Sequence, residues 1–376
     1  MTRIYLDHAA TTPMAEEVIQ VYTAEMKEEF GNPSSIHQTG RKARKKVDDA
    51  RTILANSIGA HETEITITSG GTEADNYAVF GTAYARKNEG KHIITTQIEH
   101  HAILHACEQL EKDGFDVTYL PVDKNGLNSV DDLKNSLRED TILVSVMFAN
   151  NEVGVVQPIE EIGILLKDHL AYFHTDAVQA YGSMSIDVQT AHIDLLSVSS
   201  HKINGPKGIG FLYQRKGIFL KPIFYGGQQE RKKRAGTENV PAIVAFAKAV
   251  QLKQVAITKS KLDHSPLKQV FITELESLSV PFKINGSYES VLPHVLNISI
   301  PNTDVETFLV QLDLAGIDAS SGSACTAGSI DPSHVLVAMY GENTPELRNS
   351  VRFSFGLNNT EEQVITAAHK IAKIVL

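Results

Sequence analysis

Short runs of β-favouring residues alternate with helix-forming stretches along the first two thirds of the chain, and this alternation limits the possible folds most. Segments 64–68, 92–96 and 141–148 are rich in Val, Ile and Thr, as buried strands are. Helical sequences at 72–88 and 100–114 lie between them. Strands that alternate with helices are joined by right-handed crossovers into a mainly parallel sheet covered on both faces. The sequence therefore predicts an α/β fold.

The chain is too long for one ordinary core, because 376 residues exceed the usual size of a single domain. The strand–helix rhythm changes near Ala256. A long helical stretch then leads into a smaller α+β region, with strands expected at 294–300 and 351–356. We therefore expect a large α/β domain followed by a smaller one.

Composition limits the partners and the compartment. A net charge of −10 at pH 7 disfavours nucleic acid and anionic membranes as partners. We see no apolar run of the roughly 20 residues that span a bilayer. Asp7 and His8 stand where a signal peptide would be apolar, and two cysteines cannot form a disulfide framework. We expect a cytoplasmic protein that binds neither membranes nor nucleic acid.

The two cysteines stand in opposite surroundings. Cys107 lies on a predicted helix beside Ala102, Ile103 and Leu110, which is typical of an inert core residue. Cys325 lies in the stretch "ASSGSACTAG", among serines, glycines and alanines. This setting predicts a reachable thiol on a loop.

Unusual residues follow the predicted strands, where ligands gather in open α/β sheets. Gly70 and Gly71 form a turn before a helix, whose N-terminus can bind an anion. Asp176 ends another strand, where a buried carboxylate needs a cationic partner. Lys202 stands between an apolar run and a glycine-rich segment, where desolvation would make its amine nucleophilic; a solvated loop lysine is the alternative. The "GPKGIG" run that follows precedes a strand, which excludes a dinucleotide loop.

A histidine cluster raises the question of a metal. His101 and His105 have the i, i+4 spacing of a helical metal pair, with His100 and Cys107 nearby. A strand-end histidine followed by the polar face of a helix explains the same residues, and no second ligand cluster accompanies them. We predict no firmly bound metal.

Taken together, these features resemble a known family. The chain is similar to the class V branch of the aspartate-aminotransferase fold, and within it to the NifS/IscS-like cysteine desulfurases, which use pyridoxal 5′-phosphate. The resemblance runs from residue 5 to residue 356 and rests on "YLDHAATTP", "FGNPSSIH", "TSGGTEADN", "EHHA", "ANNEVG", "HTDAVQ", "SSHKINGPKG", "RAGTEN", "SSGSACTAG" and "VRFSFG". It implies fold type I, with a large cofactor-binding domain over 14–256. A small α+β domain over 1–13 and 257–376 would carry the cysteine loop, about 319–330.

The resemblance also implies a role for each matching residue. Lys202 would hold the cofactor covalently, Asp176 would pair with its pyridinium nitrogen, and Gln179 would bind its phenolic oxygen. The catalytic set would be Cys325, Lys202 and His100, with His100 against the ring. The remaining residues would bind phosphate (Gly71, Thr72, Ser199, His201 and, across a dimer interface, Thr237) or the substrate carboxylate (Asn151 and Arg352).

The implied reaction converts L-cysteine to L-alanine and leaves the sulfur as a persulfide on Cys325. We expect a homodimer that passes sulfur to an iron–sulfur scaffold or a tRNA-thiolation enzyme, with Cys325 as a possible transient iron–sulfur ligand shared with the scaffold. Two alternatives stay open: a selenocysteine or cystine lyase on the same fold, and a cofactor-binding partner protein with little turnover.

Overall fold

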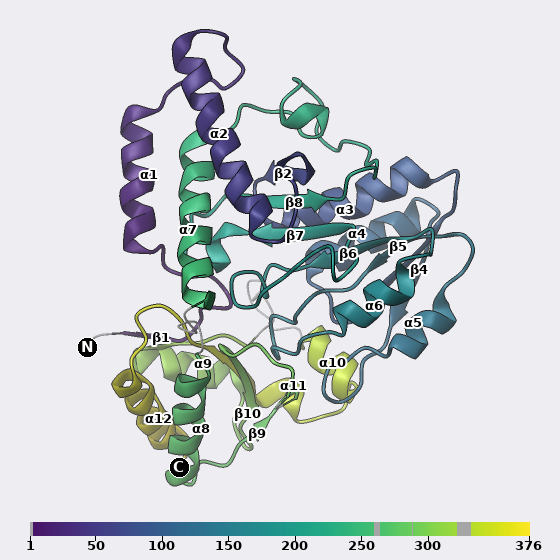
Figure 1. The fold of residues 1–376 in the computed structure, drawn as a ribbon. Helices are drawn as coiled ribbons and strands as arrows, with labels where there is room; N and C mark the ends of the chain where they lie inside the picture. The colour runs from purple at the N-terminus through teal and green to yellow at the C-terminus, as the bar shows by residue number, and fades with distance from the viewer. Residues whose placement is uncertain (1–2, 259–263, 288, 322–331) are drawn as a thin grey trace.

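The computed structural model describes residues 3–258, 264–287, 289–321 and 332–376 (Figure 1). Its centre is a seven-stranded sheet. In spatial order the strands are β2 (Ile65–Thr68), β8 (Gly210–Gln214), β7 (Leu195–Ser199), β6 (Tyr172–Asp176), β5 (Thr141–Ser145), β3 (His92–Thr96) and β4 (Asp116–Leu120). β8 runs antiparallel to β7 and β2, while the other neighbouring pairs run parallel. The prediction of a mainly parallel α/β sheet is confirmed.

Helices cover both faces of this sheet. They are α1 (Glu16–Glu28), α2 (Gln38–Asn56), α3 (Gly71–Arg86), α4 (His101–Lys112), α5 (Val130–Ser136), α6 (Ile159–Leu166) and α7 (Val240–Thr258), with single 3₁₀ turns at η1 (Glu62–Glu64), η2 (Ser200–Lys202) and η3 (Glu230–Lys232). Successive strand residues enter opposite cores: Leu195 packs with α3 and α4, whereas Leu196 packs with α2, α6 and α7. Burial on both faces explains why these strands are continuous apolar runs.

Helix α7 is the one described helix that is long and apolar enough, over Val240–Ile257, to cross a membrane by length and composition. The expectation that no run approaches that length was therefore wrong for this helix. Its side chains explain the composition, because α7 packs against α1 and α2 and buries Ile243, Phe246 and Val250 completely or almost so (Figure 1). A helix packed in this way is a core helix of a soluble protein.

The C-terminal part forms a second layer with its own sheet. Strands β12 (Ser350–Ser354), β10 (Val295–Ser299) and β9 (Lys283–Ile284) are antiparallel neighbours, and β1 (Ile4–Tyr5) pairs with β11 (Ile317–Asp318). The helices are α8 (Ser265–Ser277), α9 (Val305–Leu314), α10 (His334–Tyr340), α11 (Glu346–Asn349) and α12 (Glu361–Val375).

A separate apolar core holds this part together. Phe271, Phe308 and Phe353 are buried in it, and so are Ile4 and Leu6 from the N-terminus. The start of the chain thus packs with its end (Figure 1). The predicted division into 14–256 and 1–13 plus 257–376 stays a prediction, which the separate core supports.

Candidate active site

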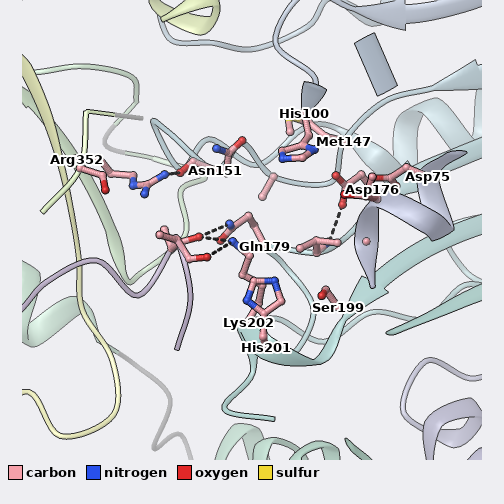
Figure 2. A pocket seen from close by; sticks show the side chains of 17 residues that line it. Asp75, His100, Met147, Asn151, Asp176, Gln179, Ser199, His201, Lys202 and Arg352 are labelled. Carbon is pink, nitrogen blue, oxygen red and sulfur yellow. Dashed lines mark hydrogen bonds between the residues drawn. The ribbon is translucent and has the colours of Figure 1, made fainter. Parts of the chain in front are cut away.

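A cavity of about 400 Å³ opens where the carboxyl ends of β6 and β7 meet the N-terminus of α3 and strand β12. The predicted site residues that line it are Gly71, Thr72, His100, Asn151, Asp176, Gln179, Ser199, His201, Lys202 and Arg352 (Figure 2). They come from both parts of the chain, far apart in sequence. The cavity has the size of a small-molecule site.

Lys202 lies in the turn η2, directly after β7. Its Nζ donates hydrogen bonds to the carbonyl oxygens of Ala9, at 2.5 Å, and Ala10, at 2.9 Å. Burial, together with the charge of Arg352, lowers the pKa of Lys202 to about 8, against the opposing effect of Asp176. A sizeable fraction of this amine is therefore neutral, and nucleophilic, near physiological pH.

Asp176 ends β6 and is 6% exposed. Its Oδ1 accepts the backbone N–H of Val178 at 2.9 Å. Gln179 follows in the same turn and donates its side-chain amide to Ala9 O, also at 2.9 Å. One turn thus brings a carboxylate and an amide to the cavity, and Lys202 and Gln179 share a carbonyl acceptor.

His100 caps the N-terminus of α4. Its Nδ1 accepts the N–H of Ala102 at 3.1 Å, so the ring proton lies on Nε2. Burial lowers the pKa of His100 to about 4, and the charge of Lys202 contributes. The cavity therefore holds a neutral imidazole at physiological pH.

The N-terminus of α3 forms an anion-binding corner. A Cβ added at Gly71 would lie 2.8 Å from Val178 Cγ2, so the backbone passes here only because residue 71 is glycine. Thr72, Ser199 and His201 surround the same corner, and Lys207 lines its outer side. The free N–H groups and the dipole of a 16-residue helix favour a phosphate at this point.

Arg352 projects from β12 into the opposite wall (Figure 2). Its Nη2 donates to Asp7 Oδ1 at 2.8 Å, and its Nη1 donates to the backbone carbonyl of Asn151 at 3.0 Å. Ser320 donates its hydroxyl to the other oxygen of Asp7 at 2.7 Å. The Nε of Arg352 has no hydrogen-bond partner within the described ranges. A carboxylate would supply one.

Two carboxyl groups at or beside the cavity were not predicted as site residues. Asp7 holds Arg352, although it stands within the quoted "YLDH" motif; the backbone of Asn151, not its amide, makes the contact. Asp75, inside "TSGGTEADN", also lines the cavity. Both motifs were signals, but only the fold shows that Asp75 lines the cavity and that Asp7 contacts Arg352.

Thr237 does not line the cavity of its own chain. It is exposed and follows the turn η3, whose residues Glu230, Arg231 and Lys232 have φ between 49° and 69°. Glu230 holds this turn, because its carboxylate bonds both Nη atoms of Arg51 at 2.7 Å and the N–H of Ile67 at 2.9 Å. The turn that precedes Thr237 is therefore anchored through Glu230, and Thr237 itself is exposed outside its own cavity.

Cys325 lies outside the described residues. Cys107 is completely buried, and burial raises the pKa of its thiol far above its ordinary value. His101 and His105 stack at 5.0 Å between ring centroids on the surface of α4. No group of three or more His, Cys, Asp or Glu side chains in the described part of the chain has a metal-binding arrangement.

The residues of the cavity fit pyridoxal 5′-phosphate. An amine with a lowered pKa, a buried carboxylate and a glycine-lined helix N-terminus surround one space, and these groups would engage an aldehyde, a ring nitrogen and a phosphate, respectively. Lys202, Asp176 and the Gly71–Thr72 turn would hold these groups.

Comparisons with known proteins agree with this chemistry. The family model Aminotransferase class-V matches residues 4–366. A putative cysteine desulfurase IscS 1 of Bacillus subtilis (strain 168) is 59% identical over 375 residues, which cover 100% of this chain and 99% of the relative. A cysteine desulfurase IscS of Methanosarcina thermophila is 48% identical over 99% of this chain and 92% of its own.

Solved structures point the same way. A NifS-like protein superposes with a TM-score of 0.92 at 35% identity, over 99% of both chains. SspA in complex with cysteine superposes with a TM-score of 0.83 at 37% identity, over 94% of this chain and 99% of the other. The chain therefore belongs to the class V aminotransferase family, in its NifS/IscS-like branch of pyridoxal 5′-phosphate-dependent enzymes.

Proposed function

We propose that this enzyme is a cysteine desulfurase that converts L-cysteine to L-alanine and holds the sulfur as a persulfide on Cys325. The observation that carries the proposal is one cavity with Lys202 on one wall and Arg352, with an unpartnered Nε among the described residues, on the other. An amino acid needs both an amine-exchanging group and a carboxylate clamp. Relatives named cysteine desulfurase, and SspA solved with cysteine, support this substrate.

The bound cofactor supplies an electron sink for negative charge at the substrate Cα. Lys202, neutral near its pKa of about 8, takes the Cα proton as a base. His100, with its proton on Nε2, exchanges a proton with the substrate thiol. Asp176 keeps a negative charge at the floor of the cavity.

In the sulfur step, one sulfur atom passes from L-cysteine to the thiol of Cys325. The Cys325 thiolate attacks the sulfur of bound L-cysteine, an S–S bond forms and the substrate C–S bond breaks. The electron pair stays on the substrate Cβ, which is protonated to give alanine. L-cysteine plus the Cys325 thiol thus gives L-alanine plus the Cys325 persulfide.

Arg352 is the proposed clamp for the substrate carboxylate. It is buried and already oriented by Asp7 and the Asn151 carbonyl, so little side-chain entropy is lost when a carboxylate binds. Asn151 itself would contribute through its side chain. Gln179 would bind the phenolic oxygen of the cofactor, and Ser199 and His201 its phosphate, together with Gly71 and Thr72.

We further propose a homodimer in which Thr237 reaches the phosphate of the partner's cofactor. Thr237 does not line its own cavity, and large apolar side chains are exposed in the single chain: Ile36 at 90%, Phe30 at 87%, Tyr225 at 79% and Phe219 at 66%. Covering these side chains with a second subunit would remove apolar surface from water, which favours association. The proposed setting is cytoplasmic, with sulfur passed to an iron–sulfur scaffold or a tRNA-thiolation enzyme.

The substitution Cys325→Ser tests the function. We expect the loaded variant to keep the cofactor's visible absorbance and lose alanine formation from L-cysteine, because a hydroxyl is a poor nucleophile toward sulfur. Cys107→Ser is the matched control and should form alanine at the wild-type rate. Wild-type alanine formation by Cys325→Ser would support the lyase alternative, and loss of the bound cofactor would make Cys325 structural.

A further inference from the structure

A second carboxyl group, that of Asp75, faces the cavity beside Asp176. Asp75 lies in α3 and is 1% exposed. Figure 2 shows the Asp75 and Asp176 carboxyl groups next to each other at one end of the cavity, and both line it. None of the roles proposed above uses Asp75.

Among the described residues, none of the interactions that shift the pKa of Asp75 comes from a cation. The ring of His174 approaches it, with Nε2 at 3.8 Å from Asp75 Oδ1. That ring is fully buried between two hydroxyls, Ser145 at 2.8 Å and Ser197 at 3.0 Å, and burial lowers its pKa to about 3, so it is neutral. Asp75 Oδ1 has no hydrogen-bond partner in the described part of the structure.

The groups around Asp176 stabilise its ionised form more than the groups around Asp75 do. It accepts the N–H of Val178 at 2.9 Å, and the charge of Lys202 favours its ionised form. Burial raises the pKa of Asp75 well above its ordinary value, the charge of Asp176 raises it further, and a hydrogen bond from Ser197 opposes the rise. Two adjacent buried carboxyl groups do not both ionise. The proton therefore stays on the carboxyl group whose ionised form is less stabilised, which is Asp75.

A third carboxyl group, that of Glu99, interacts electrostatically with this pair. Glu99 is fully buried and its Oε1 accepts from the Thr96 hydroxyl and the Met147 N–H. Burial raises the pKa of Glu99 to about 8, so it too is protonated at neutral pH. Among the described residues, a cation, Lys202, favours the ionised form of Asp176, whereas none does so for Asp75 or Glu99.

We propose that Asp75 is a positioning residue for the reaction: a neutral carboxylic acid that holds the proton of the Asp75–Asp176 pair and leaves Asp176 as the single negative charge at the floor of the cavity. It acts through Asp176 and does not touch the substrate. The inference deepens the proposed function and rests on it for its catalytic meaning. The protonation of Asp75 itself does not depend on the reaction.

The first test uses cofactor-free protein labelled with ¹³C at the aspartate carboxyl carbons and followed by NMR over pH. Labelling only aspartate keeps Glu99 silent. We expect a protonated aspartic acid at pH 7 in the wild type that is absent in Asp75→Asn. Asp194→Asn, which alters a partly buried aspartate paired with Arg215, is the matched control and should keep the signal.

Asp176→Asn should move the titration of Asp75 to lower pH, because the like charge is gone. No protonated aspartate in the wild type, its survival in Asp75→Asn, or an unchanged titration in Asp176→Asn would each overturn the proposal. This test stands even if the enzyme makes no alanine, so its failure is distinct from failure of the proposed function.

The second test follows the absorbance of the bound cofactor with pH. Asp75→Asn mimics the neutral acid, so we expect it to bind the cofactor within about tenfold of wild type, the scale of one neutral hydrogen bond. It should lack an alkaline spectral transition that the wild type shows when Asp75 ionises. Thermal unfolding of Asp75→Asn and Asp75→Ser identifies misfolding. An alkaline transition unchanged in a folded variant contradicts the proposal.

Discussion

At the scale of single residues, the site depends on groups whose charge is set by burial. Burial is the main cause of the shifted pKa of Lys202, His100 and Asp176, and the neighbouring groups that modify it differ from one residue to the next. Lys202 loses part of its charge because it is buried beside Arg352. His100 stays neutral because it is buried and lies close to the charge of Lys202, while its helix-capping contact fixes the ring proton on Nε2. These residues therefore enter the reaction in the states that the proposed roles need.

Lys202 gives a prediction about cofactor capture. An amine reacts with an aldehyde only when it is neutral, so capture should accelerate as pH rises and level off above about pH 8, not near the ordinary lysine value. Stopped-flow absorbance on cofactor-free protein measures the rate. Lys253 is the matched control: burial lowers its pKa to about 8 as well, but it does not line this cavity.

We expect borohydride to fix the cofactor on wild type and on Lys253→Ala, and not on Lys202→Ala. Peptide mapping after reduction identifies the modified lysine. Cofactor fixed to Lys253, or to Lys202→Ala protein, would contradict the assignment.

Arg352 gives a second prediction at this scale. Arg352→Lys keeps the charge but loses the planar fork that contacts Asp7 and Asn151. We expect the KM for L-cysteine to rise about 10- to 100-fold, as the loss of a hydrogen bond to a charged group implies. Arg348→Lys, at an exposed position of α11, should leave KM unchanged. A wild-type KM in Arg352→Lys would show that Arg352 does not bind the substrate carboxylate.

At the scale of elements, short turns after strands place the chemistry. The strands were predictable, because burial on both faces makes them unbroken apolar runs, as at Leu195–Ser199. Lys202 and Asp176 were found because each follows such a run. Asp75 and Asp7 were not found, since only tertiary packing brings a helix residue to the cavity wall and an N-terminal residue into contact with Arg352. Thr237 shows the same limit, because its position depends on the anchored turn η3.

The turn η3 gives a prediction about stability. Glu230→Ala would leave Arg51, 3% exposed, buried without its carboxylate. Loss of one partner of a buried ion pair costs about 3–5 kcal/mol, so we expect a clear fall in the free energy of unfolding. The exposed pair of Arg138 and Asp116 is the control: Asp116→Ala should cost less than about 1 kcal/mol. Denaturant unfolding compares them, and equal losses would contradict the anchoring role of Glu230.

At the scale of the whole molecule, the proposed dimer divides each site between two chains. Mixed dimers test this directly. Thr237→Ala and Lys202→Ala subunits should each bind the cofactor weakly alone. If Thr237 acts across the interface, a mixed dimer contains one site with both Lys202 and Thr237 intact, and cofactor binding at that site should return to wild-type affinity.

Cofactor titration of purified mixed dimers, with sedimentation velocity to confirm the assembly, measures this recovery. A mixed dimer without a wild-type site would place Thr237 in its own chain's site. A monomeric wild-type enzyme that binds the cofactor tightly would contradict the proposed dimer itself.

Sulfur is proposed to leave L-cysteine as a persulfide on Cys325. Mass spectrometry of the loaded enzyme after one turnover detects this persulfide. L-cysteine is added without an acceptor thiol, the reaction is stopped by alkylation, and the cysteine peptides are weighed. We predict one additional sulfur atom on the Cys325 peptide, equal in amount to the alanine released, and none on the peptide of buried Cys107. Alanine formed without a sulfur adduct on Cys325 would contradict the proposed persulfide mechanism.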